Sequence, residues 1–236
     1  MNDPDALASF IDKWRQRWPE WTVVEVFVPP AQRDLALAWG ALQQELTDAA
    51  WGGTDPRPGE AKLAWWQEEL SGWGRGVRRH PLGFVLQRQP APWASLAGGL
   101  PALQAARERA RDADEVFATV DPFAHAVAGI DARLFGADDA VAPGDAELVS
   151  ATLLQARFAH AGDGDLPLSV ITCAGEGDSR ALWAAQLRRR WPDAAGAPRV
   201  RRLWAALARA RLERSDAARP LSHWTALRAA WRAARG

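Results

Sequence analysis

The residue types that most often carry catalysis or bind metals are sparse in this 236-residue chain. The four histidines are scattered along the sequence, so no zinc cluster is predicted. The single cysteine, Cys173, cannot form an intramolecular disulfide, has no basic neighbour in the sequence, and is predicted to be a small buried residue. The glycine-rich stretch at 175–178 lacks the lysine and the preceding strand of a phosphate-binding loop.

The elements that would position functional side chains are predicted to be helices almost throughout. Roughly a fifth of the residues are alanine, a strong helix former. Apolar residues recur at helical spacing, as in Leu63, Trp66 and Leu70, and period-two alternation is limited to residues 22–28. Helices are expected near 31–50, 62–73, 145–161, 178–191, 198–214 and 222–235. The sequence therefore predicts an all-α fold in one domain, residues 1–236.

Fourteen tryptophans recur at positions on these helical stripes, and most of them are predicted to lie in the core. Trp66, Trp204 and Trp231 are examples. Glu68 and Glu69, which fall between Trp66 and Leu70, are expected to face solvent.

Residues 62–70 read KLAWWQEEL and are followed by RRHPL at 78–82. This pattern resembles the squalene and phytoene synthase family, and the C-terminal sequence RPLSHWTALRAAWRAAR is similar to the tail of those proteins. The resemblance implies the isoprenoid synthase fold, a single-domain helical bundle around a central cavity that holds prenyl chains. His80 matches the family's "HP" pair, where a capping or packing role is expected.

The resemblance also implies two facing pairs of carboxylates, which hold Mg²⁺ against the diphosphate of a prenyl diphosphate substrate. The first motif of the family aligns with residues 44–48, so Gln44 stands at the position of the leading aspartate and Asp48 at that of the second. Glu45 and Asp48 are candidate metal ligands, and Gln44, Glu45 and Asp48 are candidate substrate-binding residues. Alternatively, the two acids simply lie on a solvated helix face.

The second motif of the family is not found. The corresponding helix passes from Gln155 and Arg157 directly into a loop that contains Asp163 and Asp165. Because a glycine separates these two aspartates, they are not expected to share a helix face. Without a second acidic wall, the magnesium cluster of the family is not expected to assemble. No cofactor is therefore predicted, and Mg²⁺ is predicted only if the chain is an active enzyme.

Charge is unevenly distributed along the chain, although the net charge is zero. Residues 1–179 contain 15 Lys and Arg against 26 Asp and Glu, whereas residues 180–236 contain 14 Arg against three acids. The two regions either complement each other within the fold or leave a basic surface for an anionic partner. Arg199, Arg201, Arg202 and Arg209 are expected to face solvent, because they fall off the apolar stripe of their helix.

Three functions follow from these observations. The first is a non-catalytic isoprenoid-binding or assembly protein, a pseudoenzyme of the synthase family. The second is an active prenyl transferase that condenses prenyl diphosphates. The third is a basic module that binds an anionic membrane surface through its C-terminal arginine helices; binding to nucleic acid is less favoured, because no nucleic-acid motif accompanies the arginines. A cytoplasmic location, or one peripheral to the inner membrane, is expected from the acidic N-terminus and the short apolar runs.

Overall fold

The computed structural model describes residues 4–137, 140–160, 166–193, 196–214 and 216–235. This part of the chain is helical and contains no strand, which confirms the all-α prediction. The α-helices are α1 (Pro4–Arg17), α2 (Trp21–Val24), α3 (Arg33–Trp51), α4 (Arg57–Trp73), α5 (Gly83–Leu86), α6 (Trp93–Ala105), α7 (Ala113–Phe135), α8 (Asp145–His160), α9 (Leu168–Ala174), α10 (Ser179–Arg189), α11 (Arg199–Leu212) and α12 (His223–Arg235). Two short 3₁₀ helices, Glu25–Phe27 and Pro30–Gln32, join α2 to α3.

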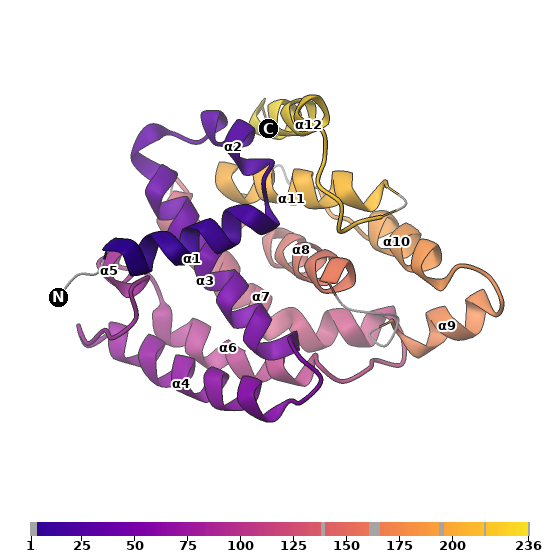
Figure 1. Ribbon diagram of the computed structural model, residues 1–236, viewed down its shortest axis with the longest axis horizontal. Coiled ribbons are helices and arrows are strands. Elements are labelled where there is room, and N and C mark those ends of the chain that lie inside the picture. Colours follow the sequence, from indigo (N-terminus) through magenta and orange to yellow (C-terminus); the bar gives the residue numbers. More distant parts are fainter. Residues whose placement is uncertain (1–3, 138–139, 161–165, 194–195, 215, 236) are drawn as a thin grey trace.

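The helices are arranged around α8, which is seen nearly end-on in the middle of Figure 1. α7 packs against one side of α8 and α11 against another. α3 runs diagonally across the bundle, with α1 crossing it and α4 beside its C-terminal half (Figure 1). α12 packs on the outer side of α11 and carries the C-terminal end of the chain.

Tryptophan fills the centre of the core. Trp14, Trp39 and Trp66 are at most 1% exposed and belong to one continuous cluster of buried residues. The predicted burial of Trp66 is confirmed. Trp231, in contrast, was expected in the core but is 51% exposed, because α12 covers the bundle with its Ala226 and Ala230 side.

Two glycines allow the helices around α3 to approach it closely. A Cβ atom at Gly40 of α3 would lie 2.7 Å from the ring of Trp14, so glycine at this position lets α1 pack directly on α3. A Cβ atom at Gly59 of α4 would collide with the carbonyl oxygen of Ala49, so this glycine lets the start of α4 reach the end of α3. Both close approaches bring charged side chains of α1 and α4 over the middle of α3.

Two further expectations about exposure, for Glu69 and Cys173, were wrong. Glu69 is 1% exposed, because its carboxylate accepts hydrogen bonds from the Trp73 indole and from the backbone N–H groups of Arg79 and His80, and so caps the turn after α4. Glu68 is exposed as predicted. Cys173 is exposed rather than buried, since α9 buries Val170 instead.

Within the described ranges, no helix combines the length and the apolar character needed to cross a bilayer.

The burial of Trp66 can be tested against that of Trp224, which is 83% exposed. Trp66→Ala should lower the free energy of unfolding by about 3–5 kcal/mol, because it leaves a large cavity in the core beside His80. Trp224→Ala should change it by less than about 0.5 kcal/mol. Urea unfolding followed by circular dichroism measures both, and equal losses in the two variants would contradict the packing described here.

Candidate functional site

The three candidate residues on α3 point in two directions. Gln44 is 6% exposed and faces α8 and α11, where it lines a small pocket together with Thr152 and Arg201. Glu45 faces the opposite way, toward α1 and α4, and is 4% exposed. Asp48 lies one turn after Gln44 and borders a separate pocket at the C-terminal end of α3. The acids therefore do not form the solvated face that was considered as an alternative.

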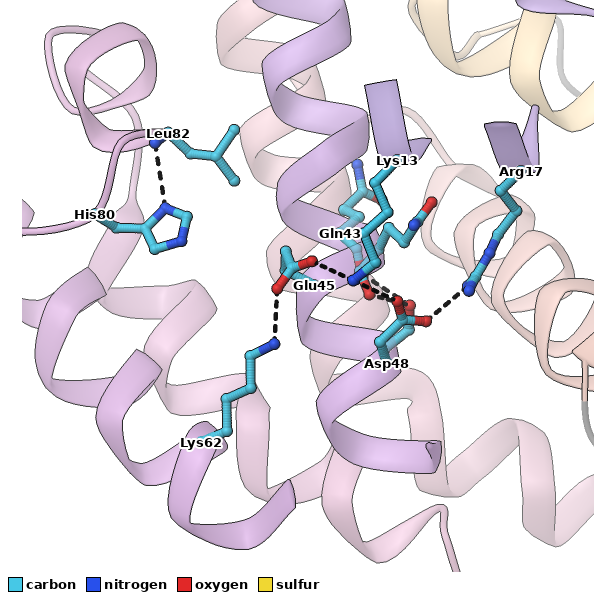
Figure 2. A network of polar contacts seen from close by, with 10 residues as sticks. Lys13, Arg17, Gln43, Glu45, Asp48, Lys62, His80 and Leu82 are labelled. Atoms are coloured by element: carbon cyan, nitrogen blue, oxygen red, sulfur yellow. Dashed lines mark hydrogen bonds and ion pairs between the residues drawn. The ribbon is translucent and has the colours of Figure 1, made fainter. Parts of the chain in front are cut away.

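Two lysines neutralise Glu45 (Figure 2). The Nζ of Lys13 from α1 donates to Oε1 at 2.7 Å, and the Nζ of Lys62 from α4 donates to Oε2 at 2.7 Å. These are the only two lysines among the 29 basic residues of the chain. The carboxylate side chain is 5% exposed, whereas the lysine side chains are 49% and 42% exposed. Both oxygens of the carboxylate are thus occupied by ammonium groups that still reach water.

Asp48 is neutralised in the same way. The Nη1 of Arg17 donates to Oδ1 at 2.7 Å, and the Nζ of Lys13 lies 3.3 Å from Oδ2. Lys13 therefore lies between the two carboxylates and joins them (Figure 2). Both cations come from α1, which the contact between Trp14 and Gly40 holds against α3.

The protonation of this cluster follows from its geometry. Burial alone would raise the pKa of the Glu45 carboxyl, but the hydrogen bonds and charges of Lys13 and Lys62 outweigh burial and hold that pKa below its ordinary value. Burial likewise would lower the pKa of Lys13, but Glu45 and Asp48 raise it above its ordinary value. Both shifts favour the charged forms, so the Glu45 carboxylate and the Lys13 ammonium stabilise each other as an ion pair.

The opposite wall, on α8, is basic where the family resemblance implied carboxylates. A pocket of about 330 Å³ lies between the ends of α3 and α8 and is lined by Arg17 and Asp48 on one side and by Ala156 and Arg157 on the other. The Arg157 side chain is 5% exposed, with its guanidinium 5.7 Å from the ring of Trp51. Asp163 and Asp165 lie outside the described residues.

The space between α3, α8 and α11 is filled by a buried polar network. Arg201 was expected to face solvent, but it is 2% exposed and its Nε donates to Oδ2 of Asp131 on α7 at 2.7 Å. The same guanidinium donates to Gln43 at 2.9 Å, and the indole of Trp39 donates to the other oxygen of Asp131 at 2.7 Å. The pocket that remains beside Gln44 has a volume of about 20 Å³, enough for one water molecule.

The sequence matches no protein-family model, and no curated protein matches it. Its structure, however, is similar to the crystal structure of a dehydrosqualene synthase in complex with ligand. The two chains align with a TM-score of 0.68 and 15% sequence identity, over 98% of this chain and 95% of the other. This chain has the isoprenoid synthase fold. The fold implied by the resemblance of residues 62–70 is confirmed.

Magnesium, which the synthase resemblance implies at the first motif, does not fit the residues present. Both oxygens of Glu45 accept from lysine, and each oxygen of Asp48 lies within 3.3 Å of a cationic nitrogen. A divalent cation would have to displace these ammonium and guanidinium groups. Across the described ranges, no group of three or more His, Cys, Asp and Glu side chains is placed to hold a metal ion.

His80, the histidine of the "HP" pair of the synthase resemblance, packs among aromatic rings. Its ring centroid lies 4.5 Å from those of Phe10 and Trp66, and its Nδ1 accepts from the backbone N–H of Leu82 at 3.2 Å. Burial lowers the pKa of His80 to about 4, although the charges of Glu45 and Glu69 act in the opposite direction. The ring is neutral at pH 7 and acts as the acceptor that caps the turn before α5.

The sequence predicted three candidate residues on α3 but not the cations that contact two of them, Glu45 and Asp48. Lys13, Arg17 and Lys62 come from helices distant in sequence, and their convergence depends on helix packing. One signal was available, because the only two lysines of an arginine-rich chain both reach the same carboxylate.

The lysine cluster can be tested by a mutant cycle. Lys13→Met combined with Lys62→Met leaves a buried carboxylate without its lysines and should lower the free energy of unfolding by about 3 kcal/mol. Glu45→Gln should lower it by only about 1 kcal/mol, because the freed lysines return to water. The triple variant should resemble Glu45→Gln. Urea unfolding measures all three, and a triple variant as unstable as the double lysine variant would contradict this account.

The low pKa of His80 predicts a pH dependence of stability. Between the ordinary pKa of 6.5 and about 4, the unfolded chain binds a proton that the folded chain does not, so the free energy of unfolding should fall as the pH falls through this window. His80→Asn keeps an acceptor for the N–H of Leu82 and removes this titration. Thermal melts between pH 7 and 5 should show a smaller decline for the variant than for the wild-type chain; parallel curves would contradict the assignment.

Proposed function

We propose that this chain is a non-catalytic protein of the isoprenoid synthase fold that serves as a binding or assembly protein. The observation that carries the proposal is the pairing of Glu45 with Lys13 and Lys62, each at 2.7 Å. A diphosphate-ionising enzyme of this fold needs metal ions to neutralise the departing pyrophosphate. Here, internal cations occupy the carboxylates that would bind those ions.

The interior of the bundle supports the same proposal. A prenyl chain needs an apolar cavity, but the space beside Gln44 contains the Arg201 and Asp131 ion pair, whose side chains are 2% and 3% exposed. Breaking a buried ion pair to admit a hydrocarbon would leave uncompensated charges. Binding inside the bundle is therefore disfavoured, and binding to its outer surface is favoured.

A second candidate, a prenyl transferase or diphosphate-binding protein, is favoured by one feature. Arg17 and Arg157 are among the residues that line the pocket of about 330 Å³ at the ends of α3 and α8. Guanidinium groups bind phosphate oxygens without a metal. If the chain has this second function, pyrophosphate should bind to it even in the presence of a metal chelator. The Arg17→Gln variant should then bind pyrophosphate less tightly than the wild-type chain does.

The first proposal is tested by assaying purified protein with Mg²⁺ and farnesyl or geranylgeranyl diphosphate. No pyrophosphate should be released above the background without protein, and calorimetric titration with Mg²⁺ should show no saturable binding. The physical reason is that arginine and lysine already neutralise the only first-motif carboxylates on α3.

Turnover that is lost in Glu45→Gln or Asp48→Asn would overturn the non-catalytic proposal and support the transferase. Glu68→Gln, which removes an exposed acid on α4, is the matched control and should leave any turnover intact. Circular dichroism of each variant establishes that it is folded.

A further inference from the structure

The outer face of α12 exposes two tryptophans. Trp224 is 83% exposed and Trp231 is 51% exposed, whereas the other twelve tryptophans of the chain are buried or half-buried. The two residues are seven positions apart, so they lie on one side of the helix. The opposite side, with Ala226 and Ala230, packs on the bundle. Two large apolar rings are therefore exposed to solvent on a helix whose other side packs on the bundle.

Arginines alternate with these tryptophans along the same face. Arg228 and Arg235 follow Trp224 and Trp231 by one helical turn each, and the Arg235 guanidinium lies 4.5 Å from the centre of the Trp231 ring. Arg228, Arg232 and Arg235 are exposed, and none of them forms an ion pair with a described residue. Their charge is available to an external partner.

A groove runs beside this face, between α11 and α12, with a volume of about 510 Å³. Alanines of both helices contribute to its lining. Its charged lining residues are Arg202, Arg209, Arg228 and Arg232 together with Asp193 and Glu213. Because the arginines outnumber the carboxylates, the groove and the exposed face of α12 form one basic, partly apolar surface. α12 itself lies at the outer edge of the bundle (Figure 1).

We infer that α12 docks this chain on an anionic phospholipid bilayer. Tryptophan favours the boundary between lipid headgroups and acyl chains, and arginines beside it pair with lipid phosphates. The charge of this surface is complementary to such a bilayer, since Arg228, Arg232 and Arg235 are exposed on α12 and four arginines line the groove against two carboxylates. A second copy of the same face is disfavoured as the partner, because the arginines would repel each other.

The inference does not depend on whether the chain is catalytic. It assigns a role to the arginines that remain on the outside after Arg201 and Arg211 are paired within the bundle.

The test is flotation of the full chain with vesicles of phosphatidylcholine, with or without phosphatidylglycerol. Binding should require phosphatidylglycerol and weaken steeply with salt. Arg228→Gln with Arg235→Gln should reduce binding roughly 25-fold and flatten the salt dependence. Trp224→Ser with Trp231→Ser should weaken binding at every salt concentration but keep its slope. The control is a double variant with Arg75→Gln and Arg88→Gln, which removes the same charge from exposed arginines on either side of α5. This variant should bind like the wild-type chain.

Four results would overturn the inference. The first is equal binding to vesicles without phosphatidylglycerol, and the second is an equal loss of binding in the Arg75 and Arg88 control. The third is displacement from the vesicles by inorganic phosphate at matched ionic strength. The fourth is binding to single-stranded RNA that is tighter than binding to vesicles and is abolished in the α12 variants. Thermal melts should place all variants within a few degrees of the wild-type chain, because the substituted side chains are exposed.

Discussion

The arrangement of the bundle depends on the buried ion pair between Arg201 of α11 and Asp131 of α7. At 2.7 Å, and with side chains 2% and 3% exposed, neither group could lose its partner without leaving a charge in the core. Gln43 and Trp39 of α3 bind the same two side chains, so the pair ties three helices together. The pair also places an arginine of α11 inside the bundle, so the space beside Gln44 is polar. The isoprenoid synthase resemblance had implied a cavity for a hydrocarbon chain there.

The same principle of internal charge compensation governs the other polar sites. Arg211 of α11 binds Glu20 through two nitrogens, with both side chains 1% exposed, and Glu20 also accepts from the backbone N–H of Leu221 just before α12. Lys13 and Lys62 compensate Glu45 on the other side of α3. Carboxylates of the acidic part of the chain are thus used to bind cations of the chain itself. The arginines of α12 have no ion-pair partner among the described residues, which leaves their charge on the outer face of this helix.

The residues whose exposure differs from the prediction share one physical cause. Helical periodicity shows which residues share a face, but it does not show how many faces a helix buries. Glu69 and Arg201 lie off the apolar stripes of their helices and are nevertheless buried, because each satisfies several hydrogen-bonding groups of neighbouring segments. Trp231 lies on an apolar stripe and is nevertheless exposed, because the small Ala226 and Ala230 make the contact with the bundle.

The sequence by itself determined that the chain is helical and that it resembles the synthases, since alanine content, apolar spacing and the segment KLAWWQEEL are local properties. It also predicted that Gln44 replaces the leading aspartate of the first motif and that the aspartates of the second are missing, and both stay predictions. Only the tertiary structure decided that Glu45 and Asp48 are bound by Lys13, Arg17 and Lys62, because those contacts join residues up to 32 positions apart. The physical reason is that a local pattern specifies a helix and its faces, whereas the partner of a buried charge is set by which helices pack together.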